Sequence, residues 1–127
     1  MRAFIASNIL IWHLRGERKA FNFLKRLELN QSYEFWIGAM QRAEIVFLMR
    51  SGEEEATLLF LSQFKTAAID QIIVDHAVSL YRMWNHSHGT DINDALLAAT
   101  AMYIGGTIFS LNYKHYPMPE VTVQKAW

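Results

Sequence analysis

The sequence of 127 residues contains no cysteine and carries no net charge. Without cysteine the protein forms no disulfide, no thiolate zinc site and no cysteine nucleophile, which fits a reducing cytoplasm. Its 12 Lys and Arg residues balance its 12 Asp and Glu residues, so the chain does not hold nucleic acid by overall charge. Any RNA binding must therefore come from a local patch, and any metal must bind to oxygen or imidazole.

A long apolar run of the membrane-spanning kind is also missing. The opening MRAFIASNILIWHL lacks a small-residue cleavage site after it, and charges follow at once from Arg15, which disfavours a signal peptide. Residues 95–113 carry no charge over 19 residues, about the length of a membrane span. Gly105 and Gly106 interrupt this run, so a buried helix, a turn and a core strand explain it better. We expect no membrane association.

Hydrophobic residues make up 52% of the chain and charged residues 19%, which is the composition of a globular protein. At this length a second core would be very small, so we expect a single domain over residues 1–127. Strands are expected at residues 2–6, 35–37, 107–110 and 121–123, with a further short run at 66–69. Their alternation with helical patterns predicts a three-layer α/β/α sandwich with a central, mainly parallel sheet of four to five strands.

Helical patterns fill the intervals between these runs. Helices are expected over residues 9–14, 17–29, 39–50, 53–64, 71–86 and 95–104. Ser7 and Asn8 are expected to cap the first of these helices and Asp70 the fifth, while either Asp91 or Asn93 is expected to cap the last. Ser7 and Asn8 follow the first expected strand and Asp70 follows the short run, so these two helix starts lie near strand ends.

Parallel sheets place their sites where the strands end and the next helices begin. The expected strand ends are residues 6–8, 38–44 and 110–112, and Asp91 and Asp94 open the helix that precedes the fourth strand. Carboxylates that meet at such an edge repel each other unless a hard divalent cation neutralises them. The sequence thus predicts an acidic site at this edge of the sheet.

Four stretches resemble the motifs of the PIN-domain ribonucleases, in the family's order. They are FIASNILIWHLRG, IGAMQRAEI, HGTDINDALLAATA and TIFSLNYKHY, which span residues 4–116. The third matches the family's Asp-Ala-Leu-Ile-Ala-Ala-Thr-Ala core with Leu97 in place of Ile, and in the second Gly38 and Gln41 stand where Ser and Thr are usual. The chain is identified as a member of that family, similar to its small VapC-like toxins of bacterial toxin–antitoxin systems.

The resemblance implies a set of metal-binding and catalytic residues. Glu44 and Asp94 carry over as metal-binding carboxylates, and Asp91 adds charge beside them. Asn112 carries over as the polar residue at the fourth position, and Ser110 as a residue that helps to orient the site.

The first acidic position of the family departs from the pattern. The residue there is Ala6, where the family has Asp. Ser7 and Asn8 carry over as residues that support this missing carboxylate and the turn that follows it. Because a central ligand is gone, we expect the protein as it stands to be inactive or weakened.

The function implied is that of a Mg²⁺- or Mn²⁺-dependent endoribonuclease toxin of a type II toxin–antitoxin system. Its implied partners are RNA, a cognate antitoxin whose segment occupies the acidic pocket, and a second copy of the chain in a homodimer. Arg15, Arg42 and Lys114, with His115 beside them, are candidates for binding the RNA backbone. Candidates for dimer contact are Tyr33, Phe35, Trp36, Phe47 and Met49.

A second class of function stays open, in which the PIN fold has lost catalysis and serves only as a protein- or RNA-binding module. Ala6 is the residue that favours this alternative. A nuclease acting on DNA flaps or on ribosomal RNA fits less well, because such proteins usually carry larger insertions or extra domains. His86 and His88 have the spacing of a metal pair, but no third ligand is in step with them, so a helix C-terminus explains them better.

Overall fold

Five strands form the central sheet in the computed structural model, which describes residues 1–127. They are β1 (Arg2–Ile5), β2 (Glu34–Gly38), β3 (Lys65–Ala67), β4 (Thr107–Ser110) and β5 (Thr122–Lys125). Their order is β3-β2-β1-β4-β5, and each neighbouring pair is parallel. The chain runs outward from β1 to β3 and then returns to the other side of β1, so the strand order reverses between β1 and β4. Ligand sites of open parallel sheets lie at such a reversal.

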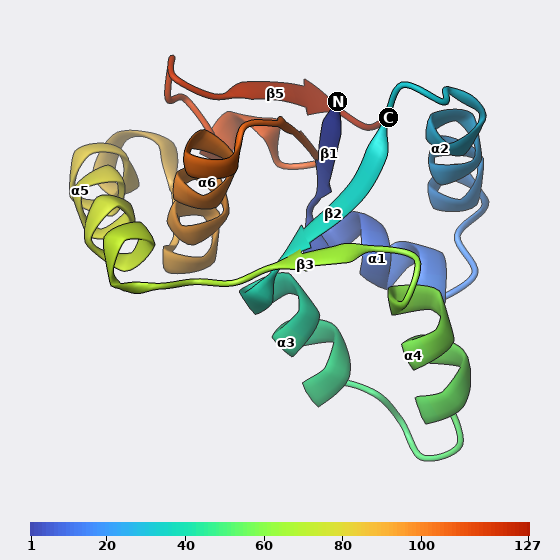
Figure 1. Ribbon diagram of the computed structural model, residues 1–127. Coiled ribbons are helices and arrows are strands. Elements are labelled where there is room, and N and C mark those ends of the chain that lie inside the picture. Colours follow the sequence, from blue (N-terminus) through green and yellow to red (C-terminus); the bar gives the residue numbers. More distant parts are fainter.

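Helices cover both faces of the sheet (Figure 1). They are α1 (Ser7–Leu14), α2 (Arg18–Leu29), α3 (Ala39–Phe47), α4 (Glu54–Leu61), α5 (Gln71–His88) and α6 (Ile92–Ile104), with a short 3-10 helix η1 (Tyr113–His115). Ala3 and Ile5 of β1 pack into a core with α1, α2, α3 and α4, whereas Phe4 and the following Ala6 pack with α5 and α6. This alternation follows from the two-residue period of a strand. The predicted three-layer α/β/α fold is therefore confirmed.

The structure confirms the predicted N-caps of two helices and contradicts the predicted N-cap of a third. The Asp70 carboxylate accepts a hydrogen bond from Ile73 N at 3.0 Å and caps α5, and of the two candidates for α6 it is Asp91 that caps the helix. The prediction for the first helix is wrong, because Ala6 is the N-cap and Ser7 lies within α1. The neighbouring Asn8 is inside the helix too, and its side chain bonds to the end of β4 instead.

The uncharged run over 95–113 is interior rather than membrane-spanning. It comprises most of α6, a turn in which Gly105 has a φ of +88°, and the fully buried strand β4. None of the helices combines the length and the apolar character needed to cross a membrane.

Candidate functional site

A polar pocket of about 180 Å³ opens where the carboxyl ends of β1 and β2 meet the N-terminus of α6. Its lining comprises Ala6, Ser7, Asn8, Ile11, Gln41, Glu44, Asp91, Asn93, Asp94, Asn112, His115 and Tyr116. The structure thus brings Ala6, Glu44, Asp94 and Asn112 together, although they come from all four motifs. The pocket adjoins the reversal of strand order, where the fold is expected to place a ligand.

Glu44 reaches the pocket from α3 and is held by a residue of α6. Asn93 Nδ2 donates a hydrogen bond to Glu44 Oε1 at 3.0 Å. This contact orients one carboxylate oxygen and leaves Glu44 Oε2 free of protein partners. Sequence reasoning considered Asn93 only as a helix cap, and its place inside the third motif was the one available sign of a role in the site.

Asp94 lies in the first turn of α6, where it forms a capping box with Asp91. Asp94 N donates to Asp91 Oδ1 at 2.7 Å, and Asp91 N donates to Asp94 Oδ2 at 3.0 Å. The His115 Nδ1 atom lies 3.1 Å from the same Asp94 oxygen. Burial raises the pKa of Asp94 above its ordinary value; the hydrogen bond from the Asp91 backbone opposes this rise, and the charge of Asp91 adds to it. Negative charge in the pocket is therefore incompletely compensated.

Tyr116 closes the buried side of the pocket. Its side chain is almost fully buried, and its hydroxyl lies beside Asp94. Burial first, and then the negative charge of Asp94, raises the pKa of Tyr116 well above its ordinary value. The residue is therefore a neutral phenol at physiological pH. In the sequence, Tyr116 stands out only as the last residue of the fourth motif.

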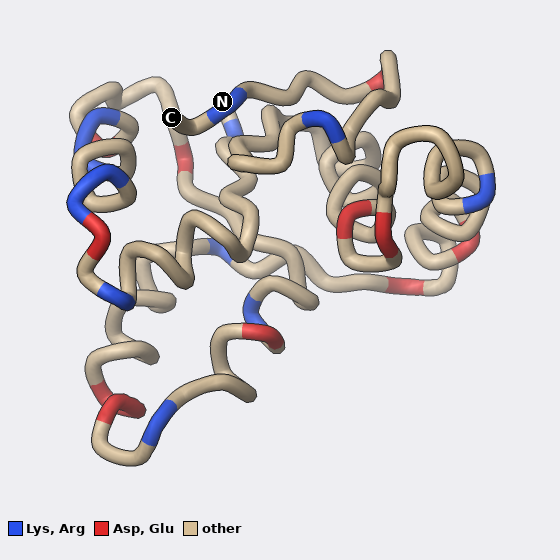
Figure 2. The backbone as a smooth tube through the Cα atoms, turned by 180° about the vertical axis from the view of Figure 1, so that it is seen from behind, with Lys and Arg blue, Asp and Glu red and all other residues tan.

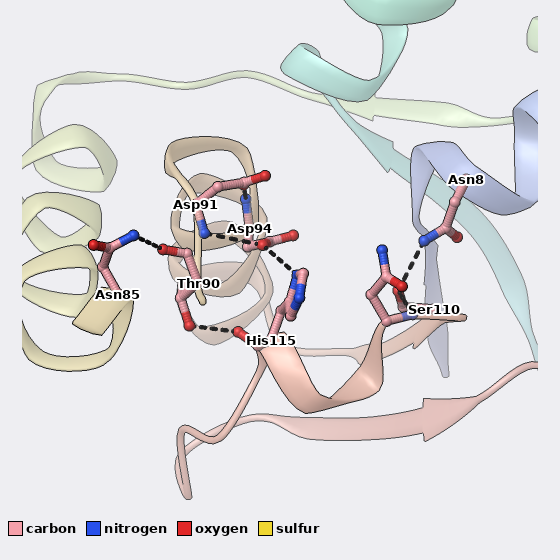
Figure 3. A network of polar contacts seen from close by, with 8 residues as sticks. Asn8, Asn85, Thr90, Asp91, Asp94, Ser110 and His115 are labelled. Atoms are coloured by element: carbon pink, nitrogen blue, oxygen red, sulfur yellow. Dashed lines mark hydrogen bonds and ion pairs between the residues drawn. The ribbon is translucent and has the colours of Figure 1, made fainter. Parts of the chain in front are cut away.

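The buried Ser110 is hydrogen-bonded to Asn8 at the edge of the pocket (Figure 3). Ser110 Oγ accepts hydrogen bonds from Asn8 Nδ2 at 3.3 Å and from Asn112 N at 3.0 Å. Asn8 Oδ1 also accepts from Leu111 N at 3.4 Å. Ser110 is buried and does not line the pocket, so its contacts with Asn8 and with the backbone of Asn112 are what connect it to the site.

Two further hydrogen bonds, also drawn in Figure 3, fix the position of His115. Thr90 Oγ1 donates to the His115 carbonyl oxygen at 2.6 Å, and Asn85 Nδ2 donates to the Thr90 carbonyl oxygen at 2.9 Å. Thr90 is completely buried. The end of α5, the loop before α6 and η1 are thereby joined, and the imidazole stays against Asp94.

The atoms around the pocket that could bind a metal are of the kind that a hard divalent cation prefers, but they are few in number. They are carboxylate, carboxamide and hydroxyl oxygens, the ligands that Mg²⁺ and Mn²⁺ prefer. No three His, Asp or Glu side chains come close enough together to hold one ion. Ala6, the motif position expected from the resemblance to be acidic, lines the same pocket without contributing an oxygen side chain.

The predicted RNA-binding cations do not line the acidic pocket. Arg15 borders a larger groove of about 750 Å³, whose walls come from α1, α3, α4 and the turn between the last two. Lys114 is exposed on η1, and Arg42 is half-buried on α3. Ile11 borders both the groove and the acidic pocket, so the two are adjacent. Figure 2 shows acidic segments at the start of α6 and several basic segments along α2 itself.

The fold and the position of the acidic pocket define the class of protein. The PIN domain family model matches residues 3–120, and the chain belongs to this family. Over 115 residues it is 31% identical to Ribonuclease VapC19 of Mycobacterium tuberculosis, a match that covers 90% of this chain and 91% of that protein. The resemblance to VapC-like PIN toxins is therefore confirmed.

Solved structures show the same fold. A chain of a toxin–antitoxin complex from Klebsiella pneumoniae has a TM-score of 0.79 at 24% identity, with 98% of each chain covered. A chain of VapBC2 from Rickettsia felis, bound to a DNA fragment from their promoter, has a TM-score of 0.77 at 21% identity and covers 100% of this chain and 99% of that one.

Proposed function

We propose that this protein is a metal-dependent endoribonuclease toxin of a type II toxin–antitoxin system, weakened by Ala6. The observation that carries the proposal is the convergence of Glu44, Asp94 and Asn112 on one pocket, with Ala6 at the remaining motif position. The name of the relative VapC19, a ribonuclease, supports RNA as the substrate. The reaction would be hydrolysis of an RNA phosphodiester to 5′-phosphate and 3′-hydroxyl ends.

Glu44 and Asp94 would hold one Mg²⁺ or Mn²⁺ ion, with the charge of Asp91 nearby. When bound, such an ion supplies Lewis-acid polarisation of a phosphoryl oxygen and a water that loses its proton more easily. The chain contributes fixed geometry, because Asn93 orients Glu44 and His115 orients Asp94. Groups that orient metal ligands in this way typically change metal affinity or activity by about 10–100-fold when removed.

Restoring the missing acid tests this function. The change Ala6→Asp should add an anionic oxygen ligand, raise Mn²⁺ affinity and give an RNase that arrests bacterial growth. Cleavage of a structured RNA pool, with and without EDTA, measures the gain. The neutral variant Ala6→Asn should not produce it, and adding Asp94→Asn to Ala6→Asp should abolish it.

A second candidate function follows if this test fails. The absence of a three-carboxylate cluster favours a binding module that has lost catalysis. If Ala6→Asp leaves metal binding and cleavage unchanged while the fold is intact, the nuclease proposal is wrong and the binding module takes its place.

Arg15, Arg42 and Lys114 are proposed to contact RNA phosphates on the way to the pocket. Each cation neutralises about one phosphate, so its removal lowers the salt dependence of binding. We expect Lys114→Ala to weaken RNA binding by the Ala6→Asp protein less at high salt than at low salt. Equal weakening at all salt concentrations would contradict a phosphate contact.

The partner proposed for the neighbouring groove is an apolar helical segment of the antitoxin. Six of the 11 residues that line this groove, called the apolar groove below, are apolar, and Leu14 and Leu48 are exposed there. Because Ile11 borders both cavities, a segment that leaves the groove reaches Glu44 and Asp94, where an Arg side chain would pair with the carboxylates. The neighbours from Klebsiella and Rickettsia, described as a toxin–antitoxin complex and as VapBC2, support such a partner.

A charge in the groove should release the toxin from its antitoxin. We expect Leu48→Glu, placed in the Ala6→Asp protein, to leave RNA cleavage intact while co-expressed antitoxin no longer restores growth. The matched control is Leu29→Glu, which changes an equally exposed leucine on α2 away from the groove. Full protection of the Leu48→Glu protein by the antitoxin would contradict the proposed docking site.

A further inference from the structure

Gln41 is a buried glutamine whose carboxamide has no partner in the protein. The residue is 3% exposed and lines the acidic pocket. The one fully enclosed polar side-chain atom without a hydrogen bond is His13 Nδ1, so the Gln41 carboxamide keeps its access to the pocket. The side chain is thus enclosed except toward the pocket, where it lies beside two carboxylates. A carboxamide placed in this way can bond only to what the pocket holds, which is either water or a ligand.

The absence of a side chain at Gly38 leaves space for the carboxamide oxygen of Gln41. The backbone of Gly38 is extended, with φ −79° and ψ 160°, so this position does not require glycine for its conformation. A Cβ atom at Gly38 would overlap Gln41 Oε1, while its next neighbour, Leu97 Cδ1, would lie at an ordinary 3.5 Å. The missing side chain therefore makes room for the carboxamide oxygen and for little else.

The position of this oxygen relative to Ala6 follows from the sheet. Strand β1 pairs with β2 in parallel, with Phe4 opposite Trp36. Two residues further along the same register, Ala6 lies opposite Gly38. Gln41 Oε1, above Gly38, thus lies at the strand end next to the one that lacks its acid. Gln41 also precedes Glu44 by three residues on α3, so the two share a helix face.

We propose that Gln41 Oε1 is an oxygen ligand of the divalent cation and completes the set begun by Glu44 and Asp94. The inference rests on the proposed function, because it assumes a cation in this pocket. Carboxamide oxygens are ordinary ligands of hard cations, although they attract them less than carboxylates do.

The other carboxamides of the pocket fit this role less well. Asn8 and Asn93 already bond within the chain, and Asn112 is exposed to water. Gln41 alone combines burial with a carboxamide free of protein partners. The pocket would therefore bind a cation more weakly than a site with three carboxylates, but without complete loss.

Mn²⁺ binding to the intact protein, measured by calorimetry, tests the assignment. Gln41→Met removes the oxygen at similar size and should weaken Mn²⁺ binding by about tenfold or more. Gln41→Glu keeps the shape, adds a charge and should tighten binding. Gln63→Met, at an exposed glutamine that does not line the pocket, should change nothing. Melting curves show whether each variant folds. If Gln41→Met does not fold, the Mn²⁺ affinity of Gln41→Glu tests the assignment in its place.

The Ala6→Asp background separates this inference from the proposed function. There the added carboxylate makes the carboxamide less necessary, so Gln41→Met should weaken Mn²⁺ binding less than in the Ala6 protein. If Ala6→Asp binds Mn²⁺ but the Ala6 protein does not, or if neither Gln41 variant changes the affinity, the role of Gln41 is refuted and the nuclease proposal stands. If no variant binds Mn²⁺, including Ala6→Asp, the proposed function itself fails.

Discussion

The Asp94 carboxylate lies where its charge is poorly solvated. Its side chain is 15% exposed, Asp91 adds a like charge beside it, and burial is the largest cause of its raised pKa. A cation in the pocket would relieve this unfavourable charge. In the absence of a cation, the same feature should reduce the stability of the fold.

Replacing Asp94 by Asn should therefore stabilise the metal-free protein. Because the folded-state pKa of Asp94 is raised, the folded chain keeps a proton that the unfolded chain has already lost, so stability falls as pH rises from the unfolded pKa through the folded one. This loss of stability persists at neutral pH. An Asn at position 94 carries no charge there and still offers an oxygen to Asp91 N. We expect a higher melting temperature for Asp94→Asn at pH 7 in EDTA, and a smaller difference near pH 4. A lower melting temperature at pH 7 would show that the His115 contact outweighs burial.

The motifs were sufficient to find the carboxylates of the site but not the residues that hold them. Glu44 and Asp94 stand at fixed places in their motifs, and both line the pocket. Asn93 gains its significance from a hydrogen bond to Glu44 on another helix, 49 positions away, and such a contact leaves no periodic trace from which it could be predicted. Gln41 gains its significance from its place above Gly38, three residues earlier, together with its burial in the pocket.

At the scale of elements, the sequence predicted where helices and strands lie better than how they begin and end. Asp91 and Asn93 are both good capping residues, yet Asn93 donates to Glu44 while Asp91 caps α6. Asn8 is likewise drawn to Ser110 instead of capping α1. In each case a polar partner on another element determines what the side chain does, and the local sequence does not contain that partner.

The early end of α3 has a similar origin. The helical pattern continues to residue 50, but α3 ends at Phe47. Glu53 Oε1 accepts a hydrogen bond from Arg50 N at 2.9 Å, and Gly52 adopts a φ of +89° in the same turn. This turn fixes the connection to α4, and with it one wall of the apolar groove.

At the scale of the whole molecule, the exposed apolar residues bear on the predicted homodimer. Of the candidates for dimer contact, Tyr33, Phe35 and Trp36 pack against the protein's own cores. Phe47 is 87% exposed, and Met49 borders the apolar groove. Phe47 is therefore the candidate with most apolar surface left to bury against a second copy.

The expected result is a dimer in sedimentation velocity at tens of micromolar protein. Phe47→Glu should place a charge in the interface and give a monomer, because association depends on buried apolar surface. Leu29→Glu, on a different helix, should remain a dimer. A monomer at these concentrations for the unchanged chain would contradict the prediction.

The pocket is lined by residues from Ala6 to Tyr116, and this has a consequence for synthesis of the chain. A nascent chain that ends before β4 already carries Glu44 and Asp94 but lacks Asn112, His115 and the strand that anchors Asn8. Partly translated or truncated chains therefore cannot assemble the site. A nuclease built in this way would become capable of cutting RNA only after β4 and η1 have been translated, by which time every residue that lines the apolar groove, from Ile11 to Thr57, has also been made.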